Sequence, residues 1–128
     1  MGWLRKDRPQ EVWETDVQPK GDIDAAHRIR EICVSAAAIV ERMATLRGRK
    51  AEAESERYQA AIKRAIEIAQ RMSDDAMRDV SVSQIILLCV KANHLKTARV
   101  LLRVIQSDKV RGGLVADCPI LIDQDAAS

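Results

Sequence analysis

The sequence predicts an all-α helical bundle, and three observations support this fold class. Hydrophobic residues make up 47% of the 128 positions and charged residues 31%, a balance typical of globular rather than disordered chains. Only 5 Gly and 3 Pro are present, so few residues would interrupt a helix. Long stretches carry apolar residues at steps of three and four, the period of an amphipathic helix. The expected organisation is an irregular arm over residues 1–21, a bundle domain over 22–112 and a tail over 113–128.

The segment 22–47 predicts a long helix, with Asp22 as its N-cap after Pro19 and Gly21. Its apolar residues alternate steps of 4 and 3, the pattern by which helices pack lengthwise against one another. They form a predicted seam, which consists of Ala25, Ile29, Ile32, Ala36, Ile39, Met43 and Leu46. Because such a seam is often shared between chains, we expect it to join two copies of this chain in a homodimer.

The apolar pattern loses its phase after Leu46 and starts again at Tyr58, from where it continues to Met72. Gly48 lies at the break and favours an antiparallel hairpin with arms 22–47 and 49–72. The alternative is one long coiled-coil helix with a shifted seam, because residues 51–57 have high helix propensity and no cap. We prefer the hairpin, since the glycine and the change of phase coincide.

A shorter and more hydrophobic helical group is predicted over residues 74–108, with Ser73 as its first cap. The spacing Ser81-x-x-Gln84 matches a capping box and predicts a buried helix over 82–92. A central strand at 85–90 is the alternative for its apolar run.

The last predicted helix covers residues 95–107 and is ended by Gly112-Gly113. Two short apolar pieces, 114–115 and 120–122, follow it and either pair as a small hairpin or dock on the bundle. No internal repeat is evident in the sequence.

No catalytic, metal or nucleotide motif stands out, so we expect a non-enzymatic protein without cofactor or metal. Asp24, His27 and Glu31 share one helix face at a spacing that metal ligands use, but no second set accompanies them. Cys89 and His94 lack a third, orienting group for nucleophilic catalysis, and the surroundings of Cys89 are apolar.

The net charge of +2 requires no polyanionic partner, but the charge is unevenly distributed. Lys96, Arg99 and Arg103 form a polar stripe on the predicted last helix. A helix, a short turn and this helix resemble the order of a helix-turn-helix, so a DNA-binding regulator that reads DNA with this stripe is the alternative function. The basic residues at 47, 49 and 50 are expected in a solvated hairpin tip.

Two of the three aromatic residues, Trp3 and Trp13, lie in the otherwise polar arm. Either the arm folds back onto its own helices, or Trp3, Leu4 and Trp13 anchor a protein partner, because tryptophan is over-represented among interface hot spots. The preferred function is therefore a protein–protein interaction or assembly module that oligomerises through its long helices and presents this arm.

Cys33, Cys89 and Cys118 are odd in number and far apart, which favours free thiols in a reducing compartment. No signal peptide is visible, and the longest apolar run, residues 85–90, is far shorter than a membrane span of about 20 residues. A cytoplasmic location without membrane association is expected.

Overall fold

A computed structural model describes residues 10–14 and 17–122. Its regular elements within these residues are all helical, which confirms the predicted all-α bundle. The elements are the 3-10 helix η2 (Val12–Glu14), the α-helices α1 (Asp22–Met43), α2 (Gly48–Gln70), α3 (Asp75–Lys91), α4 (Leu95–Leu102) and α5 (Asp108–Asp117), and the 3-10 helix η3 (Pro119–Leu121).

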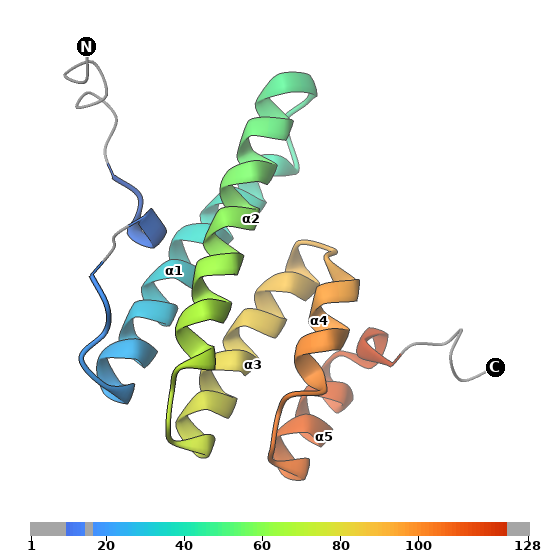
Figure 1. Cartoon of the computed structure of the whole chain (residues 1–128). Helices are drawn as coiled ribbons and strands as arrows, with labels where there is room; N and C mark the ends of the chain where they lie inside the picture. The colour runs from blue at the N-terminus through green and yellow to red at the C-terminus, as the bar shows by residue number, and fades with distance from the viewer. Residues whose placement is uncertain (1–9, 15–16, 123–128) are drawn as a thin grey trace.

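In Figure 1 the pair α1–α2 lies beside the pair α3–α4, and α5 follows at the C-terminal end. α1 and α2 pack along one another as an antiparallel pair, and α3 and α4 form a second, shorter pair. α3 contacts α1, α2, α4 and α5 and therefore lies at the centre of the molecule. This central position explains why α3 is apolar on almost every side, as the sequence predicts for the segment 82–92. Residues 82–91 of this segment are helical rather than extended.

The predicted seam of α1 is filled by this chain's own helices. Ile29, Ile32, Ala36 and Ile39 are at most 1% exposed, and α1 packs against α2 and α3. Met43 and Leu46, at the end of the seam, are partly buried. The four inner residues are therefore not available to a second copy, and the expectation that this seam forms the oligomer interface is wrong. The apolar spacing identified the buried face of α1, but not the helices that cover it.

Residues 44–47 separate α1 from α2, so residues 22–72 are not one continuous rod. Gly48 is the first residue of α2 and has a φ of 61°, a left-handed conformation that glycine adopts without strain. The direction of the chain thus reverses where the phase of the apolar pattern changes.

Helices α3 and α5 each begin at a side-chain cap, and in neither helix is it the residue that the sequence analysis predicted. Asp74 caps α3 by accepting a hydrogen bond from the Met77 amide at 2.8 Å, and Ser107 caps α5 by accepting one from the Val110 amide at 3.2 Å. Ser73, the predicted cap, precedes Asp74 by one residue. Ser81 lies inside α3 and is 1% exposed, so its capping-box spacing is coincidental. Helix α3 begins earlier because Asp74 already supplies the cap.

Asp22 does not cap its own helix, contrary to expectation. Its carboxylate accepts the amides of Ser73, at 3.0 Å, and of Asp74, at 2.6 Å, in the loop before α3. These backbone donors hold the pKa of Asp22 below its usual value, because they stabilise the ionised form.

Asp79 holds the next loop in the same manner. Its carboxylate is 2% exposed and accepts the amides of Gln106, at 3.0 Å, and of Ser107, at 2.9 Å, in the loop before α5. We call each of these arrangements an aspartate clasp: the Asp22 clasp joins α1 to the loop before α3, and the Asp79 clasp joins α3 to the loop before α5.

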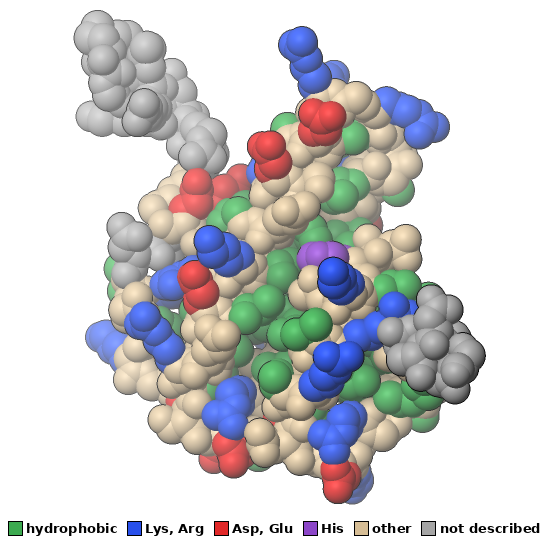
Figure 2. All heavy atoms as spheres, turned by 45° about the vertical axis from the view of Figure 1, so that its right-hand side comes forward, with side chains coloured by type: hydrophobic (Ala, Val, Ile, Leu, Met, Phe, Trp, Pro, Cys, Tyr) green, Lys and Arg blue, Asp and Glu red, His purple; other side chains and the backbone are tan. Residues whose placement is uncertain are grey.

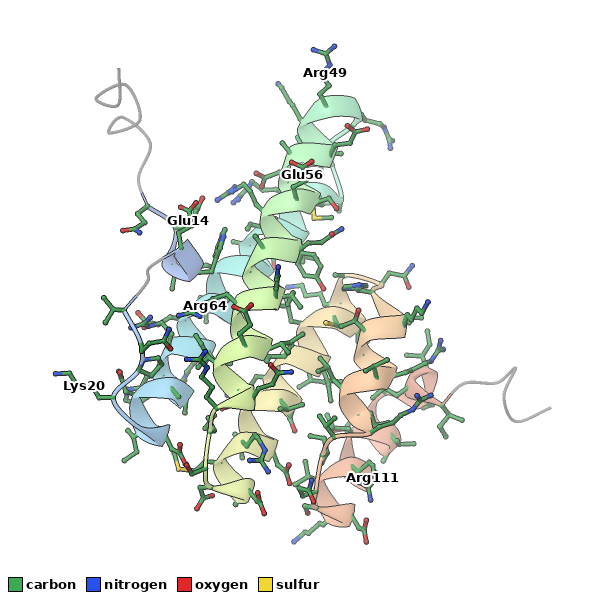
Figure 3. All side chains as sticks on the ribbon, in the orientation of Figure 1. Glu14, Lys20, Arg49, Glu56, Arg64 and Arg111 are labelled. Carbon is green, nitrogen blue, oxygen red and sulfur yellow. The ribbon has the colours of Figure 1, made fainter. Side chains whose placement is uncertain are left out.

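The loop before α3 and the loop before α5 have a common local structure. Equivalent residues of the two loops, such as the caps Asp74 and Ser107, lie 33 positions apart. Arg78 donates to the Met72 carbonyl at 2.9 Å and pairs with Asp75. Arg111, labelled in Figure 3, donates to the Ile105 carbonyl at 2.5 Å and pairs with Asp108. The chain therefore contains a structural repeat, in which a helix pair is followed by a capped loop. The sequence hides it because few identical residues, such as Asp75 with Asp108 and Arg78 with Arg111, carry it.

The C-terminal part differs from the expected one. α4 ends at Leu102 rather than at residue 107, because the Asp79 clasp holds the amides of residues 106 and 107 in a loop. Gly112 and Gly113 lie within α5 and do not end a helix. The expected domain boundary after residue 112 falls inside α5. Residues 114–115 and 120–121 are helical, and Leu114 and Leu121 are buried in the core.

The two glycines of α5 make a stability prediction possible. Gly112→Ala is expected to raise the free energy of unfolding by about 0.5–1 kcal/mol, because glycine weakens helices and an added Cβ meets no atom within 4 Å. The matched control is Gly48→Ala, which is expected to lower stability because of the positive φ at this position. Urea denaturation followed by circular dichroism measures both. A loss of stability in Gly112→Ala would contradict the helical placement of this residue.

None of the helices in the described part of the chain is both long enough and apolar enough to cross a membrane.

Candidate functional site: a groove between α2 and α4

An apolar groove of about 580 Å³ runs between α2 and α4, with α3 beneath it. It exists because α2 and α4 both pack on α3, whereas they do not pack extensively on one another. Seven apolar side chains line it: Ile66, Ala69, Val82, Ile85, Val100, Leu101 and Val104. A volume of this size lies in the usual range of binding pockets.

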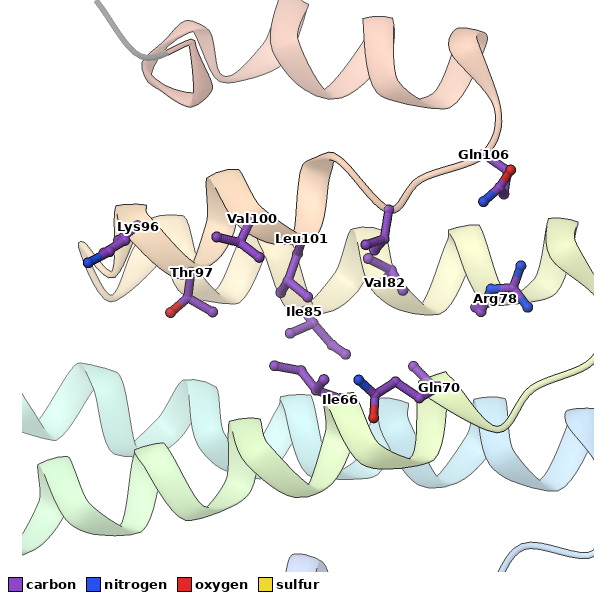
Figure 4. A pocket seen from close by; sticks show the side chains of 12 residues that line it. Ile66, Gln70, Arg78, Val82, Ile85, Lys96, Thr97, Val100, Leu101 and Gln106 are labelled. Carbon is purple, nitrogen blue, oxygen red and sulfur yellow. The ribbon is translucent and has the colours of Figure 1, made fainter. Parts of the chain in front are cut away.

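The side chains of three helices converge on the groove in Figure 4. Ile66 points up from α2, Ile85 comes from α3, and Val100 and Leu101 come from α4. Ile85 and Leu101 belong to the core, whereas Val100 and Val104 are both 51% exposed. Burying this exposed apolar surface against a ligand would contribute favourable free energy of about 25 cal/mol per Å² removed from water.

The groove continues along α2 into a second hollow of about 550 Å³, which is lined by residues from Gln59 to Gln70 and by His94 and Thr97. Figure 2 shows hydrophobic side chains gathered between α2 and α4, with Lys and Arg side chains around them. Among the described residues that line the two hollows, Lys63, Arg78 and Lys96 are cationic and Glu67 is the single carboxylate. The surroundings of the groove are therefore basic.

A chain of hydrogen bonds fixes the end of the groove at the α3–α4 turn. The two ring nitrogens of His94 lie 3.2 Å from the Tyr58 hydroxyl and 2.8 Å from the Thr97 hydroxyl. The Tyr58 and His94 rings also meet edge to face, with their centroids 5.7 Å apart. A neutral imidazole donates from one nitrogen and accepts at the other, so both hydroxyls satisfy it. The contact between α2 and the turn thus sets the position of the first turn of α4.

This arrangement has the order of a nucleophile, a base and an orienting group, but lacks the charge of a catalytic triad. Tyr58 is 3% exposed, and burial raises the pKa of its phenol, so it stays neutral. A neutral phenol does not stabilise an imidazolium as a buried carboxylate does. The hydrogen-bonded chain of Tyr58, His94 and Thr97 therefore lacks the carboxylate of a Ser-His-Asp triad.

The pair of Cys89 and His94, which the sequence already disfavours as a catalytic site, has a buried thiol. Cys89 is fully buried, and burial raises the pKa of its thiol. Burial likewise raises the pKa of the Cys33 thiol to about 12. Both thiols are thus protonated and weakly nucleophilic at neutral pH.

The arm folds back where the structure describes it. Trp13 is 7% exposed and belongs to the core, with η2 packed on α1 and α2. Arg57 lies 5.8 Å from the centre of the Trp13 ring and bonds to Glu11, which holds the arm in place. The expectation that Trp13 anchors a partner is corrected, because its ring is already covered by this chain. Trp3 and Leu4 lie outside the described residues.

The three residues of the alternative DNA-binding stripe do not act as one open face. Arg99 donates to the Ile120 carbonyl at 2.9 Å, so it is engaged with η3, whereas Lys96 lines the groove. Arg103 is exposed just after α4. The two short apolar pieces that follow the predicted last helix belong to α5 and η3, and α4 is only 8 residues long. The helix that carries the stripe is therefore shorter than the helix-turn-helix interpretation expects, and α5 and η3 follow it.

The remaining candidates are surface features. Asp24, His27 and Glu31 are exposed on α1, and the described residues contain no group of three or more potential ligands that could hold a metal ion. Arg47, Arg49 and Lys50 are exposed at the tip of the α1–α2 pair, where Figure 3 labels Arg49. This tip extends beyond α3 and α4 in Figure 1.

Sequence reasoning missed the groove, although one signal for it was present. α4 carries Ala98 and Leu101 for the core and, in addition, the exposed Val100, and the turn that follows it carries the exposed Val104. A short helix with more apolar residues than one buried face can hold indicates an exposed apolar surface. Ile66 and Ile85, which form the opposite wall and the floor, could not be assigned to the same site without knowledge of the helix arrangement.

Comparisons with models of protein families, with curated proteins and with solved structures found no match for this chain.

Proposed function

We propose that this chain is a non-enzymatic protein–protein interaction module that holds an apolar segment of a partner in the α2–α4 groove. The observation that carries this proposal is the exposed apolar wall formed by Val100 and Val104 beside Ile66. The second hollow extends the groove along α2, which favours an elongated occupant over a compact small molecule.

A helix is the form of partner that suits this groove. The site lies between two helices, and the described residues contain no strand edge on which an extended peptide could pair. An amphipathic helix placed in such a groove buries its apolar stripe and keeps its backbone hydrogen bonds internal.

Three further features belong to the proposal. The absence of enzymatic activity is supported by the neutral Tyr58 behind His94 and by the buried thiol of Cys89. A cytoplasmic location is supported by the three cysteines, which are all free. Homodimerisation, if it accompanies this function, uses a surface other than the buried seam of α1.

A selection experiment tests the proposed function. A displayed library of helical peptides is selected against the full chain, and the enriched peptides are measured by fluorescence anisotropy. Val104→Asp is expected to weaken their binding at least about tenfold, because it places a charge on the apolar wall. Circular dichroism verifies that the variant is folded, as expected for a residue that is 51% exposed.

Ile23→Asp serves as the matched control for this experiment. Ile23 is 68% exposed at the start of α1 and does not line the groove, so the substitution is expected to leave the affinity unchanged. Failure to enrich any peptide, or binding that is indifferent to Val104→Asp, would overturn the proposed function.

A further inference from the structure

The cationic side chains around the groove differ in whether they form ion pairs within this chain. Lys63 on α2 and Lys96 on α4 form no ion pair with a described residue. Arg78, at the other end, pairs with Asp75. Glu67 lies 3.6 Å from Arg64 and is thereby partly neutralised. The unbalanced positive charge is therefore concentrated where Lys63 and Lys96 flank the groove from opposite walls.

The positions of these cations divide the groove along its length. Figure 4 shows Lys96 at one end of the pocket and Arg78 with Gln106 at the other, with the apolar residues between them. Along α2 the lining runs from Gln59 to Gln70, which corresponds to roughly 16 Å or three helical turns. An occupant of about three turns would place its ends near the cations and its middle on Ile66, Val100 and Val104.

From these observations we propose that the partner segment is an acidic amphipathic helix, with an apolar stripe on the α2–α4 groove and carboxylates beside Lys63 and Lys96. This inference rests on the proposed function, since it assigns the chemistry of the occupant of the same groove. Carboxylates of the partner would pair with cations that are otherwise solvated, which increases specificity and the association rate more than the area of contact does.

The other conceivable occupants fit the charge or the shape less well. Residues 1–9 contain Trp3 and Leu4 but are basic, with three cations and one carboxylate, and would be repelled. Residues 123–128 are acidic, but their apolar residues are two alanines, which are too small to fill the groove. A second copy that offers the same face would bring like charges together. The charge pattern thus favours a different, acidic protein.

Two synthetic helical peptides test this inference. Both carry leucine at positions i, i+3, i+4 and i+7 of the same three-turn scaffold, and they differ only in having glutamate or lysine at the flanking positions. The full chain is titrated with each labelled peptide by fluorescence anisotropy at low and at high salt. We expect the acidic peptide to bind about tenfold more tightly at low salt, and the difference to shrink as salt is added.

Reversing the charges of the groove provides the second arm. The double variant Lys63→Glu/Lys96→Glu is expected to prefer the lysine peptide. The control Lys50→Glu/Lys109→Glu changes the net charge equally at exposed positions that do not line the groove, and should leave the preference unchanged.

The outcomes distinguish this inference from the proposed function. If both peptides bind equally and both are lost in Val104→Asp, the groove is a docking site but the acidic partner is wrong. If the charge reversal leaves the preference unchanged, or if neither peptide binds, the inference is also overturned. The proposed function itself is tested separately, by whether peptides are enriched in the selection and whether Val104→Asp weakens their binding.

Discussion

Asp79→Ala is expected to lower the free energy of unfolding by about 3–5 kcal/mol, although Asp79 does not itself line the groove. The carboxylate of Asp79 is 2% exposed and is the acceptor for the amides of Gln106 and Ser107. Hydrogen bonds to a charged group contribute about 1.5–3 kcal/mol each, and alanine would leave both amides without that acceptor. The measurement is urea denaturation followed by circular dichroism.

Two further variants isolate the cause of this effect. Asp79→Asn keeps one acceptor oxygen and is expected to lose less stability than alanine, because one hydrogen bond survives without the charge. Asp75→Ala removes an exposed partner of Arg78 on the same helix and should cost less than about 1 kcal/mol. If Asp79→Ala were as stable as Asp75→Ala, the Asp79 clasp would have no energetic role.

Trp13→Ala is expected to cost about 3–5 kcal/mol, because replacing a buried large aromatic residue with alanine loses its burial and leaves a cavity. The ring is 7% exposed, packs with η2 against α1 and α2, and lies under Arg57. Denaturation curves followed by far-ultraviolet circular dichroism report this loss without relying on tryptophan fluorescence.

The control for Trp13 is Ile23→Ala, which removes an apolar side chain that is 68% exposed and should change stability by less than about 0.5 kcal/mol. The peptides selected for the groove provide a second readout: at temperatures where Trp13→Ala is still folded, they should bind it normally. Unchanged stability combined with lost peptide binding would restore the interpretation of the arm as a partner anchor.

The fold could be predicted where the sequence is periodic, because the spacing of apolar residues within one helix depends only on residues that are close in the chain. The steps of 4 and 3 from Ala25 to Ile39 identified the buried face of α1, and the apolar run around Ile85 and Ile86 identified a buried helix. The same pattern could not distinguish a second copy from α2 and α3 as the covering surface, because an apolar stripe does not encode the identity of its partner.

The errors fall where distant residues decide the local structure. α4 ends at Leu102 because Asp79, 27 residues before Gln106, captures the amides of the following loop. No local breaker marks that position, so the sequence suggested a helix up to residue 107. The groove depends in the same way on the distance between α2 and α4, which α3 sets from beneath.

The pairing of helices that are neighbours in the chain also has a kinetic consequence. α1 with α2, and α3 with α4, are pairs of neighbours joined by short loops, so most of the packing is between segments close in the chain. Topologies of this kind fold on timescales of roughly microseconds to milliseconds, because little loop entropy is lost before contacts form. The Asp22 clasp spans 51 residues and the Asp79 clasp 27. The hydrogen bonds of each clasp can form only after the helices that it joins have docked. We therefore expect the clasps to form late in folding and to slow the unfolding of the assembled bundle.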